Sequence, residues 1–369
     1  MGVRFRWGVG ASVVLLASAS ACGGKVGEEG PAPTPTPTPT TTASTPPPPP
    51  PVVDGGVGPR QVACKGGSSS LARLPGERAA HVAVALDTGV LVLSSRDASD
   101  KVHVRALRDP VKGLEELSVH AGAATAVAAS GRRIAYADDK GVVVVSVADG
   151  ARVTLPIAAP VRFLGLRDTD AFVVTDAGLA RYPLAGGAEQ AICIGPTCKV
   201  PGIAGFDVRG ATLAVVGTDG ALYVGTDVGL RRAAGAVPGP VAVGSGFVAF
   251  VSANPASPKL PSLGIFRPLD EEVELYPLPV TKGACAPNQV EMLGLASDGA
   301  RLAFNTKESY PCAEAPQNVA FASRASRPEA GIVLVGAAGA AALAVDDLCA
   351  YALLGSPDAS LGSFEAPAR

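Results

Sequence analysis

The amino-acid sequence predicts an all-β domain of repeated sheets, and three observations support this fold class. A six-residue apolar strand pattern occurs seven times between residues 90 and 354. Successive copies start 34 to 54 residues apart, close to the roughly 40 to 50 residues of a four-stranded propeller blade. Each copy follows a run of small residues and precedes a turn and a further strand. We therefore expect a β-propeller of about seven four-stranded blades.

The recurring pattern is predicted to form the second strand of each blade. Its copies are VLVLSS at 90, RIAYAD at 133, AFVVTD at 171, LAVVGT at 213, FVAFVS at 247, RLAFNT at 301 and CAYALL at 349. Several of the turns that follow carry Asp and Gly, as in Asp139-Lys140-Gly141 and Asp219-Gly220, which are typical of hairpins. The third strands, such as VVVVSV at 142 and ALYVGT at 221, begin after these turns.

Small residues precede the second strands and predict inner strands that crowd against the axis of the propeller. These runs are AVALDTG (83–89), AVAASG (126–131), GFDVRG (205–210) and VAVGSG (241–246). Outer strands are predicted at 152–157 and 273–278.

The seventh blade is short of a fourth strand, because three residues follow LGSFEA at 361–366. We expect SLARLP (70–75) to supply the missing strand, which would close the ring and remove two open sheet edges. A pair of β-sandwiches or a six-bladed propeller is the alternative architecture.

The first residues of the chain predict an export signal. Arg4 and Arg6 precede an apolar stretch from Val9 to Ala19, an order typical of a signal peptide. This stretch is shorter than the roughly 20 residues that a membrane-spanning helix needs. The following Ser-Ala-Cys-Gly resembles the cleavage site of a bacterial lipoprotein, although Ala19 stands where that family usually has Leu. The resemblance implies a diacylglycerol on Cys22 and cleavage before it.

Three segments are expected: a signal peptide (1–21), a lipid-anchored linker (22–63) and the propeller (64–369). Pro31 to Pro51 is almost entirely Pro and Thr, a composition that favours an extended spacer of roughly 65 Å. Gly23 follows the cysteine where lipoproteins of the inner membrane tend to carry Asp, so the resemblance implies the outer membrane, facing the periplasm or the cell surface. An ordinary secretory signal cut after Ala21 is the alternative.

A second resemblance concerns the propeller itself. The segment LASDGARLAFNT (295–306) resembles the repeat of WD40-like propellers of the bacterial TolB type. The resemblance implies the propeller fold.

The number of cysteines agrees with a lipid on Cys22. Of the seven cysteines, six then remain, an even number that can pair completely in disulfides. In a propeller, the loops between blades and the loops from second to third strands share one face. This topology makes three pairs plausible, Cys64 with Cys349, Cys193 with Cys198 and Cys285 with Cys312. Fifteen pairings exist, and the sequence does not choose among them. A redox role for Cys193 and Cys198 is the alternative at that site, with C-x4-C spacing rather than C-x2-C.

Composition excludes some classes of function. The net charge is −2, so the chain lacks the basic field that nucleic acid requires. The sequence contains none of the common hydrolase, zinc-protease, phosphate-loop or calcium-loop motifs. The three histidines lie close to the predicted first blade, and His103 alternates with valines, so we expect it on the surface. We predict no catalytic residue, cofactor or metal site.

Two long insertions replace tight turns on one face of neighbouring blades. They are 253–262, with Lys259, and 307–317, with Lys307 and Tyr310. Loops on a rigid scaffold often bind partners. We therefore expect a lipid-anchored, non-catalytic scaffold of the cell envelope that binds an envelope or extracellular protein through Lys259, Lys307 and Tyr310. The alternative is an enzyme or a small-ligand sensor that uses the central channel.

Overall fold

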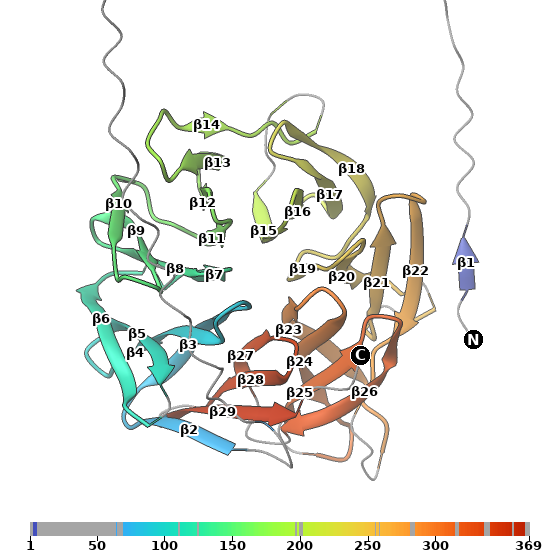
Figure 1. The fold of residues 1–369 in the computed structure, drawn as a ribbon. Coiled ribbons are helices and arrows are strands. Elements are labelled where there is room, and N and C mark those ends of the chain that lie inside the picture. Colours follow the sequence, from blue (N-terminus) through green and yellow to red (C-terminus); the bar gives the residue numbers. More distant parts are fainter. Residues whose placement is uncertain are drawn as a thin grey trace, which may run out of the picture. The chain divides into compact units, whose positions relative to one another are not determined.

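The structure, a computed structural model, is all-β in the residues that it describes. These are residues 3–5, 64, 69–109, 111–123, 125–195, 198, 202–254, 256–257, 259–280, 285–313, 317–335, 340–355 and 358–365. Their strands form seven antiparallel sheets, six with four strands and one with five. Figure 1 shows the sheets as blades around a common axis. The fold prediction of seven four-stranded blades is confirmed.

Each blade follows the chain from its inner to its outer strand. Blade one contains β3 (Arg78–Ala85), β4 (Val90–Arg96), β5 (Lys101–Asp109) and β6 (Gly113–Ala121). Blade two contains β7 (Val127–Ser130), β8 (Arg133–Asp138), β9 (Gly141–Ser146) and β10 (Arg152–Leu155). Blade three contains β11 (Phe163–Leu166), β12 (Asp170–Thr175), β13 (Gly178–Pro183) and β14 (Gln190–Ala191). Blade four contains β15 (Ile203–Arg209), β16 (Thr212–Gly217), β17 (Ala221–Thr226) and β18 (Gly229–Gly235).

The remaining blades include two departures from this order. Blade five contains β19 (Val241–Val243), β20 (Val248–Ser252), β21 (Ser262–Arg267) and β22 (Glu272–Pro277), with β1 (Val3–Phe5) beside β22. Blade six contains β23 (Gln289–Ser297), β24 (Arg301–Ser309), β25 (Gln317–Arg324) and β26 (Arg327–Val335). Blade seven contains β27 (Ala340–Val345), β28 (Cys349–Leu354) and β29 (Ala359–Glu365), and its outer strand is β2 (Ser69–Leu74).

The turns between strands contain the Asp and Gly residues that the sequence predicted there. In the turn before β9, the amide of Lys140 donates to Asp138 Oδ1 at 2.8 Å. Gly141 then adopts φ +135°, and a Cβ at this position would overlap the carbonyl oxygen of Leu155. Glycine is the residue that tolerates such a backbone. The hairpin therefore depends on Gly141.

The ring is closed by the strand that the sequence predicted. β2 pairs antiparallel with β29, with Leu74 opposite Ala359. Cys64, just before β2, forms a disulfide with Cys349 at the start of β28, with 5.7 Å between the Cα atoms. The amide of Gly76 also donates to Asp358 Oδ1 at 2.7 Å. Blade seven thus holds both ends of the described domain.

The core is divided among the blade interfaces. Seven clusters of buried apolar side chains occur, one between each pair of neighbouring blades. The second strands supply their largest members, and Leu91, Leu213, Phe250 and Phe304 are 0% exposed. This burial explains why the second strand is the most conspicuous repeat in the sequence, since a strand covered on both faces has a continuous apolar run.

Charged groups also join neighbouring blades. In blades three and four, Arg181 Nε donates to Asp170 Oδ1 at 2.7 Å and Arg181 Nη1 to Asp227 Oδ2 at 2.9 Å. Burial by itself would raise the pKa of Asp170, but the hydrogen bonds from Arg181 and Thr169 outweigh it and lower the pKa. The Asp170 carboxylate is therefore stabilised in its charged form in the folded protein.

The predicted signal peptide and linker lie outside the described residues, apart from β1. There Val3 pairs with Leu275 and Phe5 with Val273 along β22. None of the described residues forms a helix with the length and hydropathy needed to span a membrane.

Candidate functional site

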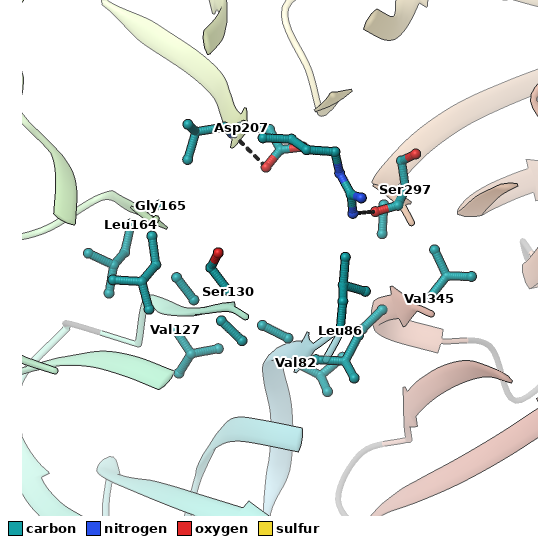
Figure 2. Close-up of a pocket in the computed structure, with 18 of the residues that line it drawn as sticks. Val82, Leu86, Val127, Ser130, Leu164, Gly165, Asp207, Ser297 and Val345 are labelled. Atoms are coloured by element: carbon teal, nitrogen blue, oxygen red, sulfur yellow. Dashed lines mark hydrogen bonds between the residues drawn. The ribbon is translucent and has the colours of Figure 1, made fainter. Parts of the chain in front are cut away.

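A cavity of about 270 Å³ lies in the central channel. Its walls come from the inner strands of all seven blades, β3, β7, β11, β15, β19, β23 and β27, mostly near their C-terminal ends. Figure 2 shows labelled side chains around this space, with Val82 and Leu86 across from Asp207 and Ser297. Most of the lining is aliphatic, as the Ala, Gly and Val content of the inner strands led us to expect.

Small residues in these strands are required by close packing. A Cβ added to Gly165 on β11 would overlap the side chain of Val208 on β15. One added to Gly205 would overlap the carbonyl oxygen of Gly239. The inner strands β11 and β15 therefore have neighbours that lie too close for larger side chains at these points.

Two charged side chains interrupt the aliphatic wall, and both belong to β15. Asp207 Oδ1 accepts from the amide of Val208 at 2.8 Å, and Oδ2 accepts from the amide of Val243 on β19 at 2.7 Å. Burial raises the pKa of Asp207 to about 6, although these amides and the nearby Arg209 oppose the shift. The carboxylate is thus fixed by backbone groups of two blades.

Arg209 extends from blade four to the turn after β23 in blade six. Its Nη1 donates to the carbonyl of Asp298 at 2.6 Å and its Nη2 to the carbonyl of Ser297 at 2.8 Å. Burial lowers the pKa of Arg209, while Asp207 and Asp298 oppose this shift electrostatically. The guanidinium is therefore held by neutral acceptors at the end of the channel.

Neither Asp207 nor Arg209 was predicted from the sequence as a site residue. Asp207 and Arg209 lie in GFDVRG (205–210), which was recognised for its small residues alone. An available signal was the spacing of two opposite charges at i and i+2 in a predicted inner strand, because alternate residues of a strand point to the same side.

The long loops of blades five and six form a second candidate region, here called the insertion face. Its described residues are 253–254, 256–257, 259–261, 278–280, 285–288 and 310–313. The loop predicted at 307–317 is shorter than expected, because β24 continues to Ser309. Cys285 and Cys312 form a disulfide across this face, with 6.3 Å between their Cα atoms. The amide of Val290 on β23 donates to the carbonyl of Lys259 at 2.9 Å. The loops are thus braced on each other and on blade six.

The predicted binding residues differ in their exposure. Lys259 and Lys307 are exposed. Lys307 lies opposite Glu291 in the pairing of β23 with β24, next to the Val290 position that contacts Lys259. Tyr310, by contrast, is 6% exposed and its hydroxyl donates to the buried carboxylate of Glu308. Tyr310 therefore supports the loop from beneath, because its side chain has become part of the packing of blade six.

The remaining cysteines also lie as the propeller topology suggested. Cys193 and Cys198 form a disulfide in the loop before β15, with 4.4 Å between their Cα atoms. With Cys64–Cys349 and Cys285–Cys312, all six cysteines of the domain are paired. Disulfides persist in oxidising compartments, so this pairing indicates a location outside the cytoplasm.

His103 is less exposed than its alternation with valines predicted. Its side chain is 17% exposed, and its ring nitrogens lie 3.3 Å from Asp97 Oδ2 and 3.2 Å from Glu116 Oε2. Nearby, Arg105 makes an ion pair with Glu77 at 2.7 Å. The histidine is thus held by Asp97 in the turn before β5 and by Glu116 on β6, which the pattern of a single strand cannot reveal. Among the described residues, no group of three or more His, Cys, Asp or Glu side chains has a geometry suited to a metal ion.

Comparison with known proteins gives matches of structure alone. No family model and no curated protein sequence matches the chain. YCF48 from Cyanidioschyzon merolae is similar with a TM-score of 0.55 and 11% identity, over 81% of this chain and 99% of that one. The structure of YCF48 bound to D1 peptide has a TM-score of 0.52 and 10% identity, over 81% and 95%. BamB from Moraxella catarrhalis has a TM-score of 0.41 and 12% identity, over 79% and 84%.

Identities this low show a shared fold and nothing finer. In this chain, six sheets have four strands and the sheet of blade five has β1 as a fifth, and β2 closes the ring. The described domain is a seven-bladed β-propeller.

Proposed function

We propose that this protein is a lipid-anchored propeller of the bacterial cell envelope that binds another envelope or extracellular protein through the insertion face. The observation that carries the proposal is the bracing of that face. Two exposed lysines border that face, Lys259 on the loop after β20 and Lys307 on β24. The Cys285–Cys312 disulfide and the Lys259–Val290 hydrogen bond fix the loops of the face to blade six. Ordered loops lose little conformational freedom on binding, so such a surface suits protein recognition.

The fold supports a binding role. YCF48, a propeller of similar structure, has been solved with a bound peptide. In our proposal the partner of this chain carries acidic side chains, which the two lysines attract. Glu291, which is also exposed, lies opposite Lys307 on the neighbouring strand and adds specificity for a partner of mixed charge.

The anchor is proposed from the sequence and supported by cysteine parity. Six of the seven cysteines pair within the propeller, so Cys22 is the one left over. If Cys22 carries lipid, its sulfur is not an odd thiol in an oxidising compartment. Two or more acyl chains hold a protein stably at a membrane. We place the anchor in the outer membrane, with the Pro-rich linker as the spacer and the chain beginning at Cys22 after cleavage.

Labelling with radioactive palmitate tests the anchor. Cells that produce the wild-type protein should yield a labelled band, and cells that produce Cys22→Ser should not. Label on Cys22→Ser would contradict lipidation at this residue.

Cross-linking in cells, followed by mass spectrometry, tests the insertion face. The Lys259→Glu/Lys307→Glu variant is compared with the wild type and with Lys101→Glu/Lys140→Glu. These control residues are a matched pair of exposed lysines, one at the start of β5 in blade one and one in the turn before β9 in blade two. We expect one partner to be captured by the wild type and the control but lost from the insertion-face variant. A partner retained by all three proteins would exclude these lysines as its binding site.

A further inference from the structure

The outer edge of blade five differs from the outer edges of the other blades. β22 pairs with β21 along all six of its residues without a shift of register. Against the third strands of their blades, β2, β6, β18 and β26 each show such a shift, and β10 and β14 are only four and two residues long. Bulges and short strands are among the devices that keep sheet edges from pairing with other chains. Of the outer strands described, β22 alone has neither device.

This edge accepts a further strand in the structure. β1 lies antiparallel beside β22 (Figure 1), and its three residues, VRF, are opposite Leu275, Glu274 and Val273 in that order. In the other six sheets, the described residues add no strand outside the fourth one. The cleavage before Cys22 that is part of the proposed function would remove residues 3–5. The outer backbone groups of β22 would then be open to another strand in the mature protein.

The surroundings of this edge are acidic. Four carboxylates lie between residues 270 and 274, from the turn before β22 into the strand itself. Two of them, on Glu271 and Glu274, form ion pairs with Arg231 and Arg267. The four carboxylates thus outnumber the two guanidiniums that pair with them, and the net negative charge favours a ligand with basic residues.

Apolar residues alternate with the glutamates along β22. Val273 and Leu275 are half-buried, and Val273 packs against the core cluster between blades four and five. Residues directly opposite each other on antiparallel strands have neighbouring side chains. A ligand strand in the register of β1 would therefore place apolar side chains beside Val273 and Leu275 and a basic side chain beside Glu274.

We propose that β22 of the mature protein binds an extended segment of another protein, in which apolar and basic residues alternate, as an added antiparallel strand of blade five. In this mode of recognition, main-chain hydrogen bonds provide affinity and the alternate side chains provide selectivity. The site is separate from the insertion face, whose proposed partner is acidic. It rests on the proposed function only through the cleavage before Cys22.

Peptide binding to the mature protein tests the proposal. The protein is purified from membranes in detergent, and its intact mass establishes whether the chain begins at Cys22. From Cys22 onward the sequence contains no tryptophan, so the anisotropy of tryptophan fluorescence reports binding of the peptide Val-Arg-Phe-Arg-Trp, which has the sequence of residues 3–7. The control peptide Arg-Arg-Val-Phe-Trp has the same composition and charge without the alternation.

We expect the alternating peptide to bind at least about tenfold more tightly than the control peptide. A chain that retains residues 3–5 would overturn both the cleavage and this inference. A chain that begins at Cys22 but binds the two peptides equally, or binds neither, would overturn this inference alone.

N-methylated peptides test whether the ligand binds as a strand. In an antiparallel pair, only alternate residues of one strand donate hydrogen bonds to the other. One peptide is therefore methylated on the backbone nitrogens of its two arginines, and a second on those of its phenylalanine and tryptophan. We expect one of them to bind at least about tenfold more weakly than the unmodified peptide and the other to bind as it does. Equal binding of the two methylated peptides would exclude strand addition.

A substitution on β22 tests the register. Glu274→Gln removes the charge opposite the ligand arginine and should weaken binding of the alternating peptide about two- to fivefold. The matched control is Glu115→Gln on β6, because Glu115 also lies on an outer strand and pairs with an arginine of the third strand, Arg108, at 2.9 Å. The control should bind the peptide as the wild type does. Equal affinities of the two variants would refute the proposed register.

Discussion

Removal of the Cys64–Cys349 disulfide is expected to cost more stability than removal of either other disulfide. The three bonds join cysteines separated by 285, 27 and 5 residues. If a disulfide acts by restricting the unfolded chain, these separations correspond to about 5.6, 3.6 and 2.1 kcal/mol at 25 °C. The order follows from topology, since the first bond joins the two ends of the ring and the last closes one loop.

The assay is urea unfolding at neutral pH of three variants in which both cysteines of one pair become Ala. Cys64 and Cys349 are buried, so their replacement also removes packing contacts of the sulfur atoms. Wild-type protein with its disulfides reduced is the control, because it loses the covalent bonds but keeps the sulfur atoms. The free energy of unfolding of each variant, relative to the wild type, gives the cost of each bond.

Equal losses for the three variants would refute the reasoning, because the entropic cost depends on loop length. A larger loss for the Cys193–Cys198 pair than for the Cys64–Cys349 pair would show that folded-state effects dominate. The pairing of β2 with β29 remains when Cys64 and Cys349 are replaced, so we expect that variant to stay folded in the absence of urea.

Three further predictions concern single residues. Gly141→Ala should lower the free energy of unfolding by about 2 to 3 kcal/mol, because the added Cβ overlaps the Leu155 carbonyl at φ +135°. The control Gly210→Ala, at φ +52° with open space around its Cβ, should lower it by about 1 kcal/mol. Equal midpoints of the two variants in urea unfolding would contradict this prediction. Asp170→Asn should lower the free energy of unfolding by about 2 kcal/mol at pH 7. Because the pKa of Asp170 is lowered in the folded state, the difference in stability between wild type and variant should vanish as the wild-type carboxylate is protonated below about pH 4. Burial raises the pKa of Asp207 to about 6 from 3.8, so its contribution has the opposite sign: as the pH falls from 7 to 4, the wild type should gain up to about 3 kcal/mol relative to Asp207→Asn. A pH-independent difference between these two proteins in urea unfolding would exclude that contribution.

The predicted binding residues differ in how well the sequence predicted their exposure. Lys259 and Lys307 were predicted on long loops of one face, and the structure exposes both but places Lys307 on β24. Tyr310 was assigned to the same surface but is buried against Glu308. A loop pattern predicts a solvated segment but does not say which of its side chains folds back onto the sheet. That choice depends on the space left beneath the loop by β24 and its neighbours.

The repeats and the closure of the ring could be predicted from the amino-acid sequence alone. Apolar strands such as RIAYAD at 133 recur because each second strand is covered on both faces, and the turn residues between them are set by backbone geometry that acts locally. The closing strand at 70–75 could be found because one blade was short of a strand. Contacts between side chains across the axis, by contrast, follow from the arrangement of all seven blades. Arg209 reaches Ser297 in a blade two positions away, and such a contact depends on the twist and closure of the whole ring, which no local pattern encodes.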